Sequence, residues 1–400
     1  MKTGIAKLFL ILSAATLLCM PAQIFASVSN DQVLSQHVKE ADGTSGQNTN
    51  SGSGIKTGHI QDGAVTDAKI TGPISASKIS STGLNADTVD GKHAADLALV
   101  GHNHDTVYQK KYGKMAVVAQ SGGDYTNPVA AMNDLATWCG TPSGTNKCLL
   151  KIMSGVYDLG GSALETRSFV DVEGSGENVT LLKSTDYVIR CSDNVEVRWL
   201  TAESTSGSNS TAFYVAGSTR LTHVTAKASG ALYHNIGIEI RFGSPLITDV
   251  TVELLLGNQI AKNWGIIADT QDKIVTLNTV RITAVNGEAD YAIGAYSGEL
   301  SMNNVTAKTY GGGTASYGIW ASGSIVSMKN SYVYGESAGI IVQSPVTIQN
   351  STIKGYSSLI IAGSTPKISL SQIDGPFNIE SGGLTCFNVY DANFMPLTCP

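Results

Sequence analysis

Three charged and three aromatic residues recur at matching positions in the second half of the chain, and they form the first candidate site. Carboxylate and guanidinium groups can exchange hydrogen bonds with hydroxyl groups, and aromatic faces offer apolar surface to a sugar ring. We therefore predict a glycan-binding groove that contains Tyr214, Glu239, Arg241, Asp269, Tyr296 and Trp320.

The same charged residues could instead perform chemistry. Asp269 or Glu239 would then act as a base or as a calcium ligand, and Arg241 would neutralise the carboxylate of a uronate sugar. Against this, Arg241 and Asp269 occupy the same position of consecutive repeats, where strands lie about 4.8 Å apart and an ordinary surface ion pair is expected. Catalysis by these residues is kept as the alternative.

His102 and His104 form a His-x-His pair that could bind a transition metal. Alternate residues of an extended segment face the same side, so both imidazoles could converge on the axis of a trimer. Imidazole is a good ligand for iron, zinc or nickel. The alternative is two exposed histidines in a hinge loop.

The cysteines lie near the two ends of the main region. Cys139 and Cys148 bracket a loop rich in glycine, proline and asparagine, and Cys386 and Cys399 bracket the C-terminal end. In an oxidising compartment we expect two local disulfides, one at each end. Cys191 is left over, and we expect it to be a buried thiol.

The N-terminus has the pattern of a secretory signal peptide. Lys2 and Lys7 precede an apolar stretch from Leu8 to Leu18, and a small-residue exit ends at Ala26. Cleavage after Ala26 is expected. A lipoprotein anchor at Cys19 is the alternative, although the leucine before it is large for that processing.

Composition narrows the class further. The signal segment carries two lysines and no acids, so the net charge of −6 becomes −6 − 2 = −8 after cleavage. An acidic chain without a basic run disfavours nucleic acid as a partner. Charged residues make up only 14% of the chain and glycine is abundant, which favours many short strands and turns. No later segment is long and apolar enough to span a bilayer.

Residues 27–54 have the composition of a flexible linker, and residues 55–112 follow with a different rhythm. A period of five residues matches neither a helix nor a strand, and one apolar side chain in five cannot form a core within one chain. We therefore predict a fibrous, trimeric shaft, the alternative being a disordered linker with chance spacing. The recurring residues, with one four-residue step, are Ile55, Ile60, Val65, Ile70, Ile74, Ile79, Leu84 and Val89.

This shaft, together with the segments Asn85–Ala94 and His102–Asp105, resembles phage tail fibres and fibre-like bacterial surface proteins. In some such fibres three copies of a His-x-His pair supply six imidazoles to one octahedral iron. The resemblance therefore implies a homotrimer with iron or another transition metal held by His102 and His104.

From residue 113 to the end the chain repeats every 20 to 30 residues. Apolar residues stand three before and two after each repeat anchor, with polar residues between them. Asn304, Asn330 and Asn350 precede three successive anchors; asparagine tolerates the left-handed conformation of a sharp bend, and stacked copies can hydrogen-bond as a ladder. The anchors are Leu200, Val224, Val250, Val280, Val305, Ser331, Ser351 and Ser371.

A further strand precedes each anchor. Three short strands per coil, stacked in parallel, describe a solenoid. We predict an all-β protein, a right-handed parallel β-helix over residues 113–400 with about 9–10 coils and three strands per coil. The first inward positions of this further strand are Phe213, Ile238, Ile266, Ile293, Ile319, Ile340 and Ile360.

The entry to this region, with Val117–Tyr125, Lys151–Tyr157 and Val172–Glu177, is similar to the opening of pectinesterases and other pectin-lyase-like proteins. The resemblance implies a helix near residues 128–138 that caps the first coil, and carbohydrate bound in a groove beside one sheet. The catalytic motifs of pectinesterases, polygalacturonases and pectate lyases are absent.

These features predict a secreted or cell-surface, non-catalytic β-helix module, a trimeric fibre or adhesin-like protein that binds glycan or another surface. One alternative is a secreted polysaccharide lyase, hydrolase or esterase acting on acidic polysaccharide. A second alternative is a structural spacer, because the fold alone does not decide function.

Overall fold

The computed structural model describes residues 88–89, 92–93, 112–255, 260–361, 366–379 and 384–398. β1 (Thr88–Val89) and β2 (Lys92–His93) form an antiparallel pair. The predicted signal peptide, linker, most of the shaft and the pair His102 and His104 lie outside these residues and stay predictions. No helix in the described part is both long and apolar enough to cross a membrane.

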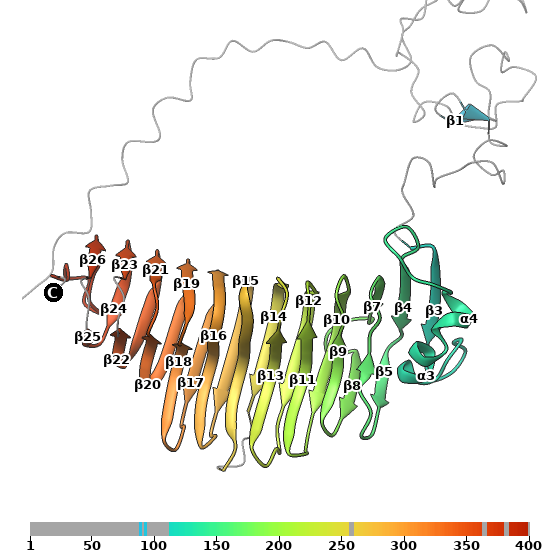
Figure 1. The fold of residues 1–400 in the computed structure, drawn as a ribbon, viewed down its shortest axis with the longest axis horizontal. Helices are drawn as coiled ribbons and strands as arrows, with labels where there is room; N and C mark the ends of the chain where they lie inside the picture. The colour runs from blue at the N-terminus through green and yellow to red at the C-terminus, as the bar shows by residue number, and fades with distance from the viewer. Residues whose placement is uncertain are drawn as a thin grey trace, which may run out of the picture. The chain divides into compact units, whose positions relative to one another are not determined.

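From residue 112 onward the chain winds into a solenoid with three faces, and each face is a sheet of parallel strands. The strands are stacked in chain order in Figure 1. We call them face 1, before each bend, face 2, after it, and face 3, which leads into the next coil. Face 1 stacks β3 (Lys114–Val118), β4 (Cys148–Ile152), β7 (Val170–Glu173), β10 (Glu196–Ser204), β12 (Arg220–Ala228), β14 (Leu246–Leu254), β15 (Lys262–Val285), β16 (Ala289–Asn303), β19 (Ser324–Lys329), β21 (Val346–Gln349), β23 (Lys367–Ser369) and β26 (Thr385–Phe387).

The longer strands bend and continue onto the next face. Face 2 stacks β5 (Gly155–Asp158), β8 (Thr180–Ser184), β10, β12, β14, β15, β17 (Thr306–Tyr310), β20 (Tyr332–Val342), β22 (Thr352–Ile361) and β24 (Gln372–Asp374). Face 3 stacks β6 (Leu164–Glu165), β9 (Tyr187–Cys191), β11 (Asn209–Ala216), β13 (His234–Arg241), β15, β16, β18 (Ala315–Ala321), β20, β22 and β25 (Phe377–Ile379). The predicted all-β right-handed parallel β-helix is confirmed, and the ten described layers of faces 2 and 3 agree with the expected number of coils.

The bend between faces 1 and 2 lies at the residue before each anchor, as predicted. That residue has a positive φ in every coil from Trp199 to Leu370, including Asn304 (56°), Asn330 (51°) and Asn350 (46°). Asparagine occupies this left-handed region more easily than other side chains. The other occupants are Trp199, His223, Asp249, Thr279 and Leu370.

Two hydrogen-bonded ladders follow the bend in the last coils. Asn350 Nδ2 donates to Asn330 Oδ1 at 2.7 Å, which is the predicted asparagine ladder. Asn330 Nδ2 instead donates to Asn303 Oδ1 at 3.0 Å, so the ladder does not continue through Asn304 as expected.

The serine anchors form the second ladder. The hydroxyl of Ser331 accepts from Val305 N at 3.0 Å and donates to Lys329 O at 2.7 Å, and Ser351 repeats both bonds one coil later. A buried hydroxyl that both donates and accepts is satisfied. This explains why serine replaces the aliphatic anchors there.

The solenoid interior is a continuous apolar core built from the predicted inward positions, from Phe213 to Ile340. The prediction of Ile360 is wrong: Leu359 pairs with Ile340 and is fully buried. The register between β20 and β22 shifts after Gly335, where β22 has one residue fewer. A constant repeat length could not reveal this shift.

Two short helices cover the N-terminal end of the solenoid, where the sequence predicts one helix (Figure 1). Asn127 caps α3 (Pro128–Asn133) by accepting from the backbone at Val129 and Ala130. α4 (Leu135–Trp138) follows after Asp134, and Met132 packs into the first coil's core. The cap hides the apolar end of the first coil, as expected.

The cysteine predictions are tested in part. Cys139 and Cys148 form the predicted disulfide beside the helical cap. Cys386 is disulfide-bonded, and its expected partner, Cys399, lies outside the described residues. Cys191 is a free, buried thiol as predicted, and burial raises its pKa.

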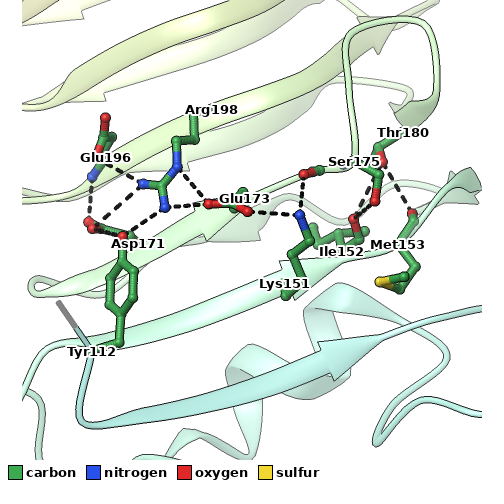
Figure 2. Close-up of polar contacts among 11 residues, drawn as sticks. Tyr112, Lys151, Ile152, Met153, Asp171, Glu173, Ser175, Thr180, Glu196 and Arg198 are labelled. Atoms are coloured by element: carbon green, nitrogen blue, oxygen red, sulfur yellow. Dashed lines mark hydrogen bonds and ion pairs between the residues drawn. The ribbon is translucent and has the colours of Figure 1, made fainter. Parts of the chain in front are cut away.

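A cluster of charged side chains covers part of face 1 in the first coils (Figure 2). Arg198 donates to Glu173 and to Glu196, and the latter bond is 2.9 Å long. The Tyr112 hydroxyl donates to Asp171 Oδ2 at 2.7 Å and accepts from Arg198 at 2.9 Å. Tyr112 lies two residues before β3 begins at Lys114, so this cluster holds the beginning of the described solenoid against its outer surface.

Candidate ligand-binding groove

Face 3 carries a surface groove with a volume of about 340 Å³. Its lining comes from five neighbouring strands, β9, β11, β13, β15 and β16, so the groove crosses the rungs of the solenoid. The lining residues are Tyr187, Asn209, His234, Ile236, Glu239, Arg241, Trp264, Ile267, Asp269 and Tyr296. Four of the six residues predicted for the site are therefore brought together here.

An ionic triad lies at the centre of the groove. Arg241 Nε is 3.0 Å from Glu239 Oε1, and Arg241 Nη1 is 3.1 Å from Asp269 Oδ2. Arg241 and Asp269 face each other on β13 and β15, which is the ion pair expected from their equivalent positions. Only 7% of the Glu239 surface is exposed. The carboxylate is therefore largely removed from water, and Arg241 balances its charge there.

Tyr296 lines the groove beside an irregularity in the pairing of β15 and β16. The register between β15 and β16 shifts after Ala268, so Asp269 pairs with Ser297 rather than with Tyr296 as the repeat predicts. The Ser297 hydroxyl donates to Asp269 Oδ1 at 2.6 Å. Tyr296 lies at this bulge, and 39% of its surface is exposed.

The floor of the groove is apolar although it lies outside the core. Ile236, Trp264 and Ile267 pack as a separate cluster with Tyr291. The rings of Trp264 and Tyr291 are stacked, with centroids 3.8 Å apart and planes at 6°. A Cβ at Gly294 would lie 2.5 Å from the Trp264 ring, so the indole occupies space that only glycine leaves free.

Sequence reasoning missed Trp264 because it stands two residues before the inward Ile266, and strict alternation would bury both. The strand breaks this alternation at Gly265, where a Cβ would meet the side chain of Ile282 at 2.3 Å. In the six consecutive coils from Ala212 to Gly339 the same place is always small, which is the signal that could have revealed the break; the coil before them has Val188 there. The column is Ala212, Gly237, Gly265, Ala292, Gly318 and Gly339.

Tyr214 and Trp320, the two remaining predicted residues, do not line the groove. Each packs edge-on against a residue that does. Tyr214 lies 5.7 Å from Tyr187, and Trp320 lies 4.9 Å from Tyr296, measured between ring centroids. They support the two ends of the groove rather than its floor.

The polar side of the groove was not predicted. It consists of Tyr187, Asn209 and His234, on strands that lie side by side. Burial, and then the charge of Lys262, lower the pKa of His234, so its imidazole is neutral at pH 7. Burial raises the pKa of the Tyr187 phenol, which keeps it protonated.

A buried polar ladder lies beside the lining residues of β13, β15 and β16. Asn235 Nδ2 donates to Asn263 Oδ1 at 2.8 Å, and Asn263 Nδ2 donates to Asp290 Oδ1 at 2.7 Å. Gly287 N also donates to this oxygen, at 3.1 Å. Asp290 Oδ2 has no hydrogen-bond partner among the described residues, and burial raises the pKa of Asp290 to about 6.

A second hollow of about 180 Å³ adjoins the groove and shares Tyr187 with it. Arg190 lies over the Tyr187 ring at 4.0 Å, and its Nη1 atom is 3.5 Å from Glu165. Asp186 also lines this hollow. Within the described part of the chain no group of three or more histidine, cysteine or acidic side chains is arranged to hold a metal ion.

Searches of protein-family models and of curated proteins gave no match to this chain. Solved structures do match. The A-module of a mannuronan C-5 epimerase from Azotobacter vinelandii is 13% identical, with a TM-score of 0.44 over 72% of this chain and 97% of that module. Pectin methylesterase from carrot is also 13% identical, with a TM-score of 0.34 over 68% of this chain and 89% of the enzyme.

A viral protein shows a similar likeness. The ORF18 protein of Geobacillus virus E2 is 12% identical, with a TM-score of 0.34 over 69% of this chain and 60% of that protein. At such identities the likeness is one of fold alone. The chain is a right-handed parallel β-helix protein.

Proposed function

We propose that the groove on face 3 binds a glycan and that the chain is a non-catalytic module of a secreted or cell-surface protein. The observation that carries this proposal is the apolar floor around Trp264 beside the hydrogen-bonding groups of Arg241 and Asp269. Sugar rings present apolar faces and hydroxyl-bearing edges, so they need both kinds of surface together.

The two ends of the groove support the same proposal. Tyr296 is the most exposed aromatic ring of the lining and offers a face for stacking, while the buried Trp264 keeps the floor rigid. Tyr187 marks the opposite end, where Asn209 and His234 add neutral polar groups.

A glycan array with the mature protein tests the proposal. We expect binding that falls about tenfold or more in Tyr296→Ala, because one stacking surface is lost. Tyr356→Ala is the matched control, since Tyr356 lies at the bend of β22 between faces 2 and 3, outside the strands that line the groove, and is 86% exposed. A wild-type protein that binds no glycan would favour the structural spacer.

The two carboxylates that flank Arg241 favour a second candidate, a polysaccharide lyase, hydrolase or esterase. Glu239 or Asp269 would be the base in that case. Incubation with a panel of acidic polysaccharides, followed by assay of unsaturated and reducing ends, tests it. Turnover that is abolished by Asp269→Ala or Glu239→Ala would replace the binding proposal.

We further propose that the module is secreted and trimeric. The Cys139–Cys148 disulfide is in keeping with an oxidising compartment. The five-residue period of residues 55–89 supports a shaft in which several chains bury their apolar residues together. A trimer would present three copies of the groove, and linked copies raise the avidity of a weak site.

A further inference from the structure

We infer that the groove selects an uncharged glycan and rejects chains of uronic acids or other carboxylated sugars. This inference rests on the proposed glycan-binding function and names the ligand class of the same site. It follows from the charges around the groove and from the way in which each arginine is already paired.

Acidic groups exceed basic ones along the groove and the adjoining hollow. The lining carries Glu239 and Asp269 against Arg241, and the hollow carries Glu165 and Asp186 against Arg190, which gives −4 + 2 = −2. Of the neighbouring groups that act on His234, Lys262 on β15 adds one positive charge and Glu288 one negative charge, so the sum stays at −2. His234 adds no charge at pH 7 because burial and Lys262 lower its pKa.

Arg241 is already committed to two carboxylates. Glu239 and Asp269 lie 3.0 and 3.1 Å from different nitrogen atoms of the guanidinium. A ligand carboxylate that reached Arg241 would have to share it with two resident anions or displace one of them. A displaced Glu239 would be left unpaired in a desolvated place, which is strongly unfavourable.

Arg190 is paired with a resident acid as well, and its buried Nε atom has no hydrogen-bond partner among the described residues. Its guanidinium lies over Tyr187 and within 3.5 Å of Glu165, and Asp186 is close by in the same hollow. Both arginines therefore serve to neutralise resident acids. Like charges brought together across an interface discriminate against the wrong partner.

Hydroxyl groups fit the same surroundings. The carboxylates of Glu239 and Asp269 are hydrogen-bond acceptors, and a sugar hydroxyl is a donor that brings no charge. Neutral His234 and protonated Tyr187 exchange hydrogen bonds with hydroxyls in the same way. The site is thus suited to a polyhydroxylated, uncharged chain.

Matched oligosaccharides of equal length test the inference: a neutral hexagalactan and a hexagalacturonate, each titrated into the full-length mature protein at low salt. We expect the neutral chain to bind at least about tenfold more tightly, because a carboxylate next to net negative charge is repelled. Asp269→Asn removes one acid and breaks one of the two ion pairs of Arg241. It should therefore shift the ratio of the two affinities toward hexagalacturonate by about tenfold.

Asp374→Asn is the matched control, because it makes the same charge change at an ion pair with Lys354 on face 2 and should leave the ratio unchanged. A wild-type preference for hexagalacturonate would overturn the inference while leaving glycan binding intact. Neutral binding with a ratio that Asp269→Asn does not change would also overturn it. Binding of no glycan on a broad array would remove the proposed function and the inference together.

Discussion

A buried carboxylate ends the polar ladder beside the groove, and one of its oxygens is unpaired. Asp290 accepts hydrogen bonds at Oδ1 from Asn263 and Gly287, whereas Oδ2 has no partner in the described region. Burial raises its pKa from 3.8 to about 6, which means that the folded state holds a proton more tightly than the unfolded state. Stability is therefore lost as the pH rises from about 4 through about 6.

Asp290→Asn should remove this loss. The amide keeps an oxygen that accepts from Asn263, and it carries no charge at any pH. Above pH 6 we expect a gain of at most about 3 kcal/mol in the free energy of unfolding, from a shift of roughly two pKa units. The gain should vanish near pH 4. Urea unfolding across pH 4–8 measures it, and a gain that is independent of pH would contradict the assignment to Asp290.

Gly294 provides the space that the Trp264 indole fills. In Gly294→Ala the new methyl group would meet the ring at 2.5 Å, so the indole must move. We expect a shifted tryptophan emission, a loss of about 1–3 kcal/mol in stability from overpacking, and weaker glycan binding. Gly313→Ala is the control, because its Cβ would lie at an ordinary 3.5 Å from the nearest atom. Unchanged emission in Gly294→Ala would contradict the packing described for the floor.

At the scale of the strands, the repeat predicts which residues face inward wherever the backbone keeps its alternation. It therefore gave the core positions and the left-handed bend at Asn304, Asn330 and Asn350 correctly. It failed where the backbone departs from a regular repeat, at Gly265 and at Ile360. Such breaks depend on packing between coils, and one strand's own sequence does not contain that information.

The groove shows the same division. Glu239, Arg241 and Asp269 were predicted because they occupy regular outward positions. Trp264 and His234 were missed because they lie near the beginning of β15 and β13, before the regular inward positions of these strands. The loops that lead into these strands differ in length between coils. Glycan binding by any of these residues stays a prediction.

The bend ladder offers a test at this scale. Leu370 has φ = 50° and is 49% exposed, in the position where the two preceding coils have Asn350 and Asn330. Leu370→Asn should stabilise the protein by about 0.5–1 kcal/mol, because asparagine adopts the left-handed region at lower cost. The converse change, Asn350→Leu, also breaks the 2.7 Å bond to Asn330 and should destabilise. Thermal unfolding measures both changes in stability. Because Asn350→Leu also loses a hydrogen bond, its change should be larger than that of Leu370→Asn, and changes of equal size would argue against the ladder.

In a solenoid each coil contacts its neighbours only, so the ends decide where unfolding begins. At the N-terminal end Tyr112 bonds to Asp171 and Arg198 of the face 1 cluster in Figure 2. Tyr112→Phe removes the hydroxyl from both, and we expect faster proteolysis near residue 112 with little change in the central coils. Tyr356→Phe serves as the control. Equal cleavage rates in the two variants would mean that the cluster does not hold this end.

The predicted assembly of the molecule rests on residues 55–112, for which the sequence predicts a trimeric shaft. Apolar residues spaced by five need partner chains for burial, and a His-x-His pair supplies two imidazoles per chain. Three chains would complete one six-imidazole site, so metal analysis should find one ion for every three chains. Light scattering on the mature protein should give three times the mass of one chain.

The double variant His102→Ala and His104→Ala separates the two parts of this prediction. It should lose the metal completely, whereas the trimer should persist if the apolar period from Ile55 to Val89 provides most of the association. A trimer that dissociates in the variant would show that the metal holds the chains together. A wild-type protein that is a monomer would remove the shaft and the metal site at once, because neither His102 nor His104 could reach six-fold coordination alone.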